Sequence, residues 1–372
     1  DFHLTRFLKA NVPIHNMLEV RLMKESDHTK YGLFLKNHPD SLFEHSLAVR
    51  DLIQKHFKFT PKYLVAIDDM LKIQGILPLF EAKSFVEGKR LVSIPFFPFG
   101  GILADTVEIK KQLIDAAIKM ADDYLFLEIR QRGGLNSEIE TSLKDQYPEN
   151  FAKQTPITDF FIDFHQSLED TWSNLHPEIR KHIKKATNNN LKFEIKNDNE
   201  SLEIYYDLYL NTRKKRGVPA WPKAIFSQAL KTTNSKIAII YKDDQAIVAG
   251  FFHFHGKEIL YGFSGADYSK LHLRPYFLLV WKMIQYGFKH GYTHIDYGGS
   301  SKQLNDGKLT EYKERWCNRE EEIPYYYYAK NPKNLPNLDS SLSMYKLYGK
   351  VWSKLPKSVI NLISPPIIRQ FS

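Results

Sequence analysis

The sequence predicts an α+β protein made of two related units, each a mixed, mainly antiparallel sheet flanked by helices. Apolar residues alternate along the chain between the two-residue period of strands and the longer period of helices. An Asp-Asp turn at residues 68–69, followed by Gly75, recurs 175 residues later at residues 243–244, followed by Gly250. In both halves this hairpin precedes another strand, a glycine-containing loop, a helix and a strand. That order indicates a diverged tandem duplication.

The first half is predicted to alternate helices and strands. The segment 41–57 carries apolar residues at helical spacing, among them Leu42, Val49 and Leu52. We expect helices at 41–57 and 107–120, and strands at 63–67, 73–80, 91–95 and 124–129. The stretch 131–154 that follows is polar and shows no strong pattern.

The second half shows the same alternation. We expect helices at 177–187, 202–216 and 275–289, and strands at 237–241, 246–255, 259–264 and 293–296. Pro275 suits the first turn of its helix, because a proline at that position removes no helical hydrogen bond. Gly291 suits the end of the same helix, where a left-handed residue is common.

The length of the chain favours two domains rather than one. We assign residues 1–155 to the first domain, residues 156–330 to the second, and residues 331–372 to a linker and a basic, apolar tail. The tail has two readings: a helix docked on the body, or an interfacial helix in peripheral contact with a membrane. No stretch is apolar over about 18 residues, so no transmembrane helix is predicted. We expect a cytoplasmic protein, either free or peripheral at the inner face of the membrane.

Composition restricts the classes of function. The net charge of +9 suits a nucleic acid, a phosphorylated substrate or an anionic membrane as partner, and equally a protein that is only highly soluble. The single cysteine, Cys317, excludes an internal disulfide and a cysteine-based metal site, and no obvious base lies beside it. His253 and His255 share one strand face and would make half a metal site at most. No metal centre is therefore predicted.

The segment 291–316, GYTHIDYGGSSKQLNDGKLTEYKERW, carries the most chemistry. In it a helix end, a short strand with Asp296 as its one acid, a Gly/Ser loop and Lys313 follow one another. A lysine in this setting can offset the negative charge that develops on a carbonyl oxygen during acyl transfer. Asp296 either anchors a turn, or orients a substrate amine or acts as a base.

Other residues could hold an anion. Arg213 and Arg216 can bind a phosphate or a carboxylate in bidentate fashion. A strand and loop with Gly265, followed by Arg274 at a helix start, fit loosely the plan of a phosphate cradle. No GxxxxGK[ST] or GxGxxG motif occurs, so the signal for a nucleotide cofactor is weak. The basic helix at 177–187 is either a solvated face or a phosphate-binding one.

Five stretches together resemble one protein family. They are LVSIPFFPFGGILAD at 91–105, TWSNLHPEIRKHIKKA at 171–186, the basic run at 213–219, the strand and loop at 261–266, and 292–316 with its Asp-x-Gly-Gly-Ser and Tyr-Lys-x-x-Trp motifs. In this ordered set the chain resembles the Fem-type family, the aminoacyltransferases that build peptidoglycan interpeptide bridges, and related exopolysaccharide-associated proteins. Both groups are built from tandem acetyltransferase-like (GNAT) domains. The tail is similar to that of the exopolysaccharide-associated branch.

The resemblance implies acyl or aminoacyl transfer to an amine of a cell-envelope precursor, related to peptidoglycan or exopolysaccharide. The family's aromatic-lysine pair, usually Phe-Lys, falls on Tyr312 and Lys313, where the lysine is thought to stabilise the tetrahedral oxyanion. The family's arginine for the precursor phosphate corresponds to Arg213 or Arg216. The long helical arm of some tRNA-dependent members is absent here, as it is from other members.

We therefore predict an active site in the second domain. Its expected residues are Lys313 and Asp296 as catalytic groups, Arg213, Arg216, Gly298, Gly299, Ser300, Lys302 and Tyr312 as substrate-binding groups, and Gly265 and Arg274 as cofactor-binding groups. No tightly bound cofactor is expected: the acyl donor is either aminoacyl-tRNA or acyl-CoA, and the acceptor is an anionic envelope precursor or a saccharide. Two alternatives stay open, a CoA-dependent N-acetyltransferase that acts on a saccharide and a noncatalytic polysaccharide- or RNA-binding scaffold.

Overall fold

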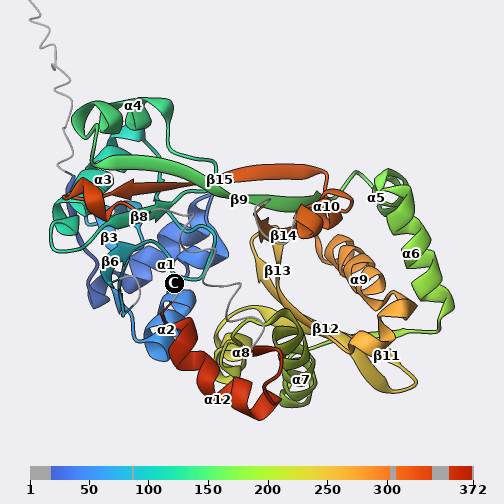
Figure 1. Cartoon of the computed structure of the whole chain (residues 1–372). Coiled ribbons are helices and arrows are strands. Elements are labelled where there is room, and N and C mark those ends of the chain that lie inside the picture. The colour runs from blue at the N-terminus through green and yellow to red at the C-terminus, as the bar shows by residue number, and fades with distance from the viewer. Residues whose placement is uncertain (1–17, 86–87, 302–306, 337–351, 371–372) are drawn as a thin grey trace, which may run out of the picture.

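Two units lie side by side in this computed structural model and share one long sheet (Figure 1). The structure describes residues 18–85, 88–301, 307–336 and 352–370. In order of neighbours, the strands of the long sheet are β10 (Lys192–Lys196), β11 (Ser235–Lys242), β12 (Gln245–His255), β13 (Glu258–Ala266), β14 (His294–Ser300), β9 (Phe151–Asp163), β15 (Arg319–Tyr328), β8 (Leu127–Arg130), β6 (Gly88–Val92), β5 (Phe80–Ser84) and β2 (Thr60–Pro61). The smaller sheet, in the first unit, contains β1 (Glu19–Leu22), β3 (Leu64–Ile67), β4 (Ile73–Leu77) and β7 (Leu103–Ala104) in that order.

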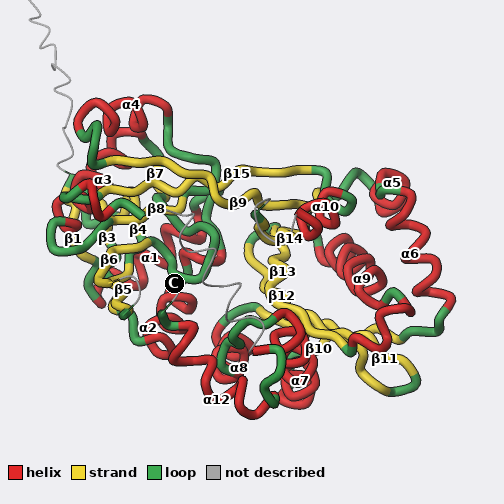
Figure 2. The backbone as a smooth tube through the Cα atoms, in the orientation of Figure 1, coloured by secondary structure: helices red, strands yellow, loops and turns green. Residues whose placement is uncertain are grey.

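Helices cover the faces of both sheets. The α-helices are α1 (His28–Asn37), α2 (Leu47–Phe57), α3 (Val107–Ala121), α4 (Ser137–Gln146), α5 (Leu168–Asn174), α6 (Pro177–Asn188), α7 (Asn199–Arg216), α8 (Lys223–Thr232), α9 (Pro275–His290), α10 (Lys308–Glu314) and α12 (Lys357–Ile368). Short 3-10 helices are η1 (Glu25–Asp27), η2 (Phe43–His45), η3 (Tyr268–Leu273) and η5 (Pro332–Asn334). In the second unit α9, backed by α6, packs on one face of the sheet, and α7 and α8 pack on the other (Figure 2).

The two units repeat one topology. Each begins its sheet with an antiparallel hairpin, β3–β4 in the first unit and β11–β12 in the second. Each then has a parallel pair joined by a helix, β6 and β8 around α3, and β13 and β14 around α9. In both units a later strand also pairs with the second strand of the hairpin. Ala104 of β7 pairs with Gly75, and Gly265 of β13 pairs with Ala249. The tandem duplication predicted from the sequence is therefore confirmed in the topology.

Two long strands join the units. β9 spans 13 residues and crosses the predicted boundary between residues 155 and 156. β15 pairs with β9 along its whole length, and its end at residues 325–328 also pairs with β8 of the first unit. Figure 1 shows both strands running from one unit into the other. The stretch 131–154, which showed no pattern in the sequence, forms α4 and the start of β9.

Two predicted elements differ from those observed. The predicted helix at 41–57 begins only at α2, because Ser46 is extended (ψ 145°) and its hydroxyl accepts a hydrogen bond from the Val49 N–H, as a helix N-cap does. The predicted strand at 73–80 is divided into β4 and β5. Pro78 lies between them, where it cannot donate a hydrogen bond to a sheet.

The tail adopts the first of its two predicted readings. α12 packs on α7, with Ile360 and Ile368 buried. The Ser364 hydroxyl accepts a hydrogen bond from the Ala220 N–H at 2.9 Å. Contact of this helix with a membrane stays a prediction, and residues 337–351 of the linker and tail lie outside the described residues. Across the described ranges, no helix is both long and apolar enough to cross a bilayer.

Candidate active site

The site forms where two parallel strands of the second unit separate. The pairing of β13 with β14 starts at Glu258 and His294 and stops at Leu260 and Asp296. Beyond this point β13 pairs only with β12. On its other side β14 carries a bulge against β9 between residues 296 and 299. Gly298, inside the bulge, has a left-handed backbone with φ +78°. The bulge turns backbone carbonyl groups away from the ladder and towards α10.

Lys313 occupies this bulge from α10. Its Nζ donates hydrogen bonds to the carbonyl oxygens of Gly298 at 2.6 Å and Gly299 at 3.0 Å, and the residue is only 7% exposed. Of the three N–H bonds of an ammonium group, one is left without an acceptor among the described residues. Burial lowers the pKa of Lys313, and the charges of Asp159 and Asp296 oppose that fall. A buried cation with one free donor is suited to hold an oxyanion.

Two buried acids lie beside this lysine. The Asp296 carboxylate accepts a hydrogen bond from the Gly298 N–H at 2.7 Å. Burial raises the pKa of Asp296 well above its usual value, and the charges of Asp159 and Glu258 raise it further. Asp159, on β9, is fully buried, and neither of its carboxylate oxygens has a hydrogen-bond partner among the described residues. The sequence reasoning did not find Asp159. A sequence feature that could have indicated this residue is an acidic side chain directly before an apolar run at 160–162.

The two predicted arginines differ in their surroundings. Arg216 ends α7 with an exposed side chain, and its charge acts on the pKa values of Tyr261, Tyr276 and Lys313. Arg213 instead serves the fold. Its Nε donates to the Pro219 carbonyl oxygen at 2.8 Å, and its guanidinium lies over aromatic rings of the unit's core.

Most of the other predicted residues have structural partners. The Tyr312 hydroxyl lies 3.5 Å from that of Tyr297, and the Ser300 hydroxyl lies 2.9 Å from that of Thr310. Arg274 caps the start of α9, and its Nε is buried without a partner among the described residues.

Of the last two predicted residues, one has a packing role and the other is not described. Gly265 packs directly on α7, since a Cβ there would lie 2.1 Å from the Tyr209 backbone nitrogen. Lys302 lies outside the described residues.

A cavity of about 1110 Å³ lies between the two units. Its walls come from α1, the loops at 101–104 and 131–136, the β12–β13 hairpin and the start of β14. Three lysines line it without a carboxylate partner among the described residues, namely Lys36, Lys110 and Lys257. A cavity with this lining favours a ligand that carries several negative charges.

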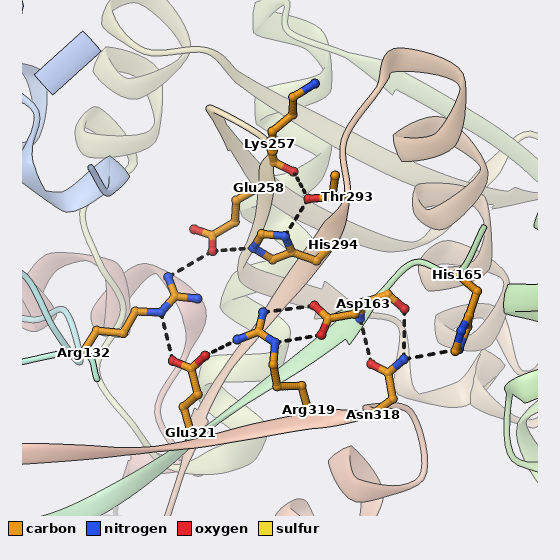
Figure 3. A network of polar contacts seen from close by, with 10 residues as sticks. All are labelled: Arg132, Asp163, His165, Lys257, Glu258, Thr293, His294, Asn318, Arg319 and Glu321. Carbon is orange, nitrogen blue, oxygen red and sulfur yellow. Dashed lines mark hydrogen bonds and ion pairs between the residues drawn. The ribbon is translucent and has the colours of Figure 1, made fainter. Parts of the chain in front are cut away.

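A polar network closes one wall of this cavity (Figure 3). Arg132 bonds to Glu258 at 3.0 Å and to Glu321 at 3.3 Å. His294 Nε2 lies 2.9 Å from the same Glu258 carboxylate. Arg319 continues the network from Glu321 to Asp163. The network ties β9, β13, β14 and β15 together, so it holds in place the strands that carry the two buried acids.

The predicted half metal site has another role. His253 bonds to the Ser235 hydroxyl at 2.7 Å and stacks on Phe43 of the first unit. His255 bonds to the Ser41 hydroxyl at 3.0 Å, so both histidines hold the two units together. Within the described residues, no group of three or more histidine, cysteine or acidic side chains could hold a metal ion. Burial raises the pKa of the Cys317 thiol, which disfavours the thiolate that a nucleophile needs.

Comparisons with known proteins agree with this architecture. Residues 173–314 match the family model of an acetyltransferase (GNAT) domain. Among solved structures, FemX is similar with a TM-score of 0.66 and 12% identity, over 89% of this chain and 100% of FemX. A comparison with curated proteins finds no match.

Two further structures share the fold. One is the C-terminal domain of a protein named as a lysylphosphatidylglycerol synthetase from Agrobacterium fabrum, with a TM-score of 0.53 and 10% identity over 86% of this chain and 95% of that one. The other is a tandem GNAT protein from the clavulanic acid biosynthesis pathway, with a TM-score of 0.50 and 11% identity over 86% of this chain and 100% of that one. The predicted fold of two tandem GNAT-like domains is thus confirmed. The chain has the fold of FemX and of tandem GNAT proteins, and residues 173–314 in its second unit match the acetyltransferase (GNAT) domain.

Proposed function

We propose that this protein transfers an acyl or aminoacyl group to an amine of an anionic cell-envelope precursor, related to peptidoglycan or exopolysaccharide, and so forms an amide bond. The observation that carries the proposal is the position of Lys313. Its ammonium group is buried at the bulge of β14, next to the point where β13 and β14 separate, and keeps one N–H free of acceptors among the described residues. In a GNAT-type domain this is a place where a reacting carbonyl can be held against a fixed positive charge.

The reaction needs little more than positioning and charge. The acceptor amine attacks the acyl carbon, and the carbonyl oxygen becomes an oxyanion that Lys313 stabilises. Asp296, which directly precedes the bulge on β14, orients the amine. Because both groups are buried, their charges act in a medium of low dielectric, where such interactions are stronger than in water. Loss of one oxyanion donor costs a factor of roughly 10² to 10³ in kcat in other enzymes.

The cavity between the units supports an anionic acceptor. Lys313 and Asp296 do not line this cavity, so the acceptor amine would have to extend from it to the bulge of β14. Lys36, Lys110 and Lys257 line it, and the two arginines of its wall are already paired with carboxylates. A substrate with phosphate or carboxylate groups would therefore meet the three lysines rather than the arginines. One protein with the same fold is named for the synthesis of lysylphosphatidylglycerol, and the resemblance to Fem-type proteins points to peptidoglycan precursors.

Two donors fit the proposal, aminoacyl-tRNA and acyl-CoA. The GNAT domain at 173–314 and the likeness to a tandem GNAT protein favour the second candidate function, a CoA-dependent N-acetyltransferase that acts on a saccharide. Against a tight pyrophosphate site stands Gly265, which is buried and packs closely on α7. The exposed Arg216 at the end of α7 could pair with a phosphate of either donor.

The experiment is a transfer assay with matched lysine variants. Acetyl-CoA and aminoacyl-tRNA are tested as donors against a nucleotide-linked muropeptide and an amino sugar oligosaccharide as acceptors. Lys313→Met should lower kcat by roughly 10² to 10³, whereas Lys308→Met, on the exposed side of the same helix, should leave it unchanged. Activity that survives in Lys313→Met, or the absence of transfer from either donor, would contradict the proposal. The second result would favour a binding scaffold instead.

A further inference from the structure

Asp159 is a buried carboxylate that the proposed mechanism has not used. It lies on β9, opposite Gly299 in the bulge of β14, and it is 0% exposed. A Cβ on Gly299 would lie 3.9 Å from Asp159 Oδ1, so the carboxylate turns towards the same bulge that Lys313 occupies. Both of its oxygens lack a hydrogen-bond partner among the described residues. A buried charge without such partners costs folding free energy, so a functional reason for it is expected.

The groups around Asp159 come from every neighbouring element. They are Lys313 of α10, Cys317 after α10, Asp296 of β14, Glu258 of β13, Arg132 after β8, Glu44 of η2 and Tyr325 of β15. Three of these groups are carboxylic acids, which makes four with Asp159, and two are cations. Burial raises the pKa of Asp159 to about 6, although the charges of Arg132 and Lys313 act in the opposite direction. After burial, the charge of Asp159 contributes most to the raised pKa of Asp296.

A second buried aspartate shows the contrast. Asp68, in the first hairpin, accepts hydrogen bonds from the Met70 N–H, the Lys72 N–H and the Gln74 amide. Burial acts to raise its pKa, but these hydrogen bonds keep the pKa of Asp68 below its usual value. A structural aspartate in this protein is thus satisfied and ionised. Asp159 has a single donor of this kind, the Phe160 N–H, which acts to lower its pKa but does not reach full hydrogen-bond geometry. Its environment is therefore that of a group that carries a proton for part of the time.

We propose that Asp159 and Asp296 share one proton, and that through this sharing Asp159 makes Asp296 the acceptor of the proton released when the substrate amine attacks the acyl carbon beside Lys313. The inference rests on the proposed acyl transfer and deepens it. Asp159 is too deeply buried to touch a substrate, so it is a positioning residue that acts through Asp296. The Asp296 carboxylate bonds to the Gly298 N–H, and Asp159 Oδ1 faces Gly299, so both carboxylates lie at the same buried bulge. Two carboxylates in one buried site cannot both be ionised at low cost, and their proton belongs to the pair.

The proton balance of the reaction closes within the site. The amine nitrogen forms a bond to the acyl carbon. It gives one proton to the two aspartates, which before this step hold one proton and one negative charge between them. The bond from the acyl carbon to the ester oxygen of a tRNA, or to the sulfur of CoA, breaks with its electron pair. The departing oxygen or sulfur then takes a proton back from the pair. The pair is therefore ionised again at the end of each cycle, and no other reactant is needed.

The first test measures titration without any substrate. The full-length protein, labelled with ¹³C at aspartate carboxyl carbons, is titrated by NMR, with Asp159→Asn, Asp296→Asn and Asp68→Asn used to assign the signals. Asp159 and Asp296 should titrate together above the range of ordinary aspartates, while Asp68 titrates below it. Asp159→Asn should lower the apparent pKa of Asp296, because the neighbouring negative charge is gone, and Asp296→Asn should do the same for Asp159. Independent titrations in the ordinary range would overturn the inference.

The second test measures the pH profile of kcat with the donor and acceptor that support transfer. In the wild type, kcat should rise with pH through the titration of the pair, since only the ionised pair accepts a proton. Asp159→Asn should move this rise to lower pH and reduce the plateau, because Asp296 alone is a weaker base. Asp68→Asn should leave the profile unchanged.

Stability separates this role from a structural one. Asp159→Asn should be at least as stable as the wild type at pH 8, since it removes a buried charge. A loss of stability with an unmoved pH profile would show that Asp159 is only structural. A coupled titration without transfer from any donor would instead contradict the proposed function and leave the pair standing.

Discussion

Gly298 meets two demands of the candidate site with one residue. Its φ of +78° is costly for any residue with a side chain, and a Cβ there would lie 3.6 Å from the Lys313 ammonium. We expect Gly298→Ala to cost about 1–2 kcal/mol of stability from the backbone. We also expect kcat to fall by about 10- to 100-fold, because the strained backbone would shift the two carbonyl groups that hold Lys313. Urea unfolding and the transfer assay measure the two effects.

Gly291 provides the matched control for this change. It ends α9 with a φ of +77°, and a Cβ there would meet nothing within 4 Å. Gly291→Ala should lose a similar amount of stability and keep its kcat. If both variants lose activity equally, the effect belongs to the backbone of the second unit and not to the bulge. If Gly298→Ala is fully active, the reacting carbonyl does not lie beside Lys313.

At the level of single residues, the sequence identified part of the site. Lys313 and Asp296 could be picked out because they stand alone in a short segment of unusual composition, and the structure places both at the bulge. Asp159 could not, because its meaning depends on a bulge in another strand, 137 residues further on at Asp296. The choice between Arg213 and Arg216 also required the structure. The two lie less than one helical turn apart, yet only Arg213 is fixed by the Pro219 carbonyl.

At the level of elements, the contact of β13 with α7 is as tight as a backbone allows. A Cβ on Gly265 would lie 2.1 Å from the Tyr209 nitrogen and 2.2 Å from the Leu208 carbonyl carbon, and neither backbone atom can move alone. We expect Gly265→Ala to destabilise the protein by about 1–3 kcal/mol or more, because the helix must move away from the strand. Urea unfolding followed by circular dichroism measures the change.

A glycine-to-alanine substitution in α1 should instead increase stability. Gly32 is exposed, and a Cβ there would meet nothing within 4 Å. Gly32→Ala should stabilise the protein by about 0.4–1 kcal/mol, since alanine loses less backbone freedom on folding. A Gly265→Ala variant as stable as the wild type would mean that α7 does not rest on β13. The loop after Gly265 would then be open for the phosphate cradle that the sequence predicted.

The elements that the sequence missed are those whose partners are distant. β9 and β15 pair with each other and with strands of both units, but neither shows the regular alternation of a half-buried strand. β15 instead contains four consecutive tyrosines at 325–328, three of them buried. Helices such as α9 were predicted closely because their period, their first-turn proline and their final glycine are all local signals.

At the level of the whole molecule, the shared sheet makes the two units one body. β15 lies within the predicted second domain, yet its end pairs with β8 and its Tyr326 joins the hydrophobic core around α3. A second cluster also crosses the interface, from Phe43 and Phe57 of the first unit to Phe226 and Phe251 of the second. The two units therefore share part of their hydrophobic core.

This coupling can be tested through the position of the tryptophans. All five lie after residue 171, and Trp281 and Trp316 belong to a core cluster that contains second-unit residues only. Leu113, fully buried on α3, belongs to the first unit. Leu113→Ala should lower stability by about 2–5 kcal/mol through the cavity that it creates. If the units unfold together, tryptophan fluorescence should report that loss in full, with the same urea midpoint as circular dichroism.

The control is Leu33→Ala on α1, where the side chain is 59% exposed and the change should stay within about 0.5 kcal/mol. An unchanged fluorescence midpoint in Leu113→Ala, together with two steps in circular dichroism, would mean that the second unit stays folded when the first is lost. Strand pairing through β9 and β15 would then be too weak to couple the units. The bulge that holds Lys313 would in that case depend on the second unit alone, and substitutions in the first unit should change binding in the cavity without changing the position of the lysine.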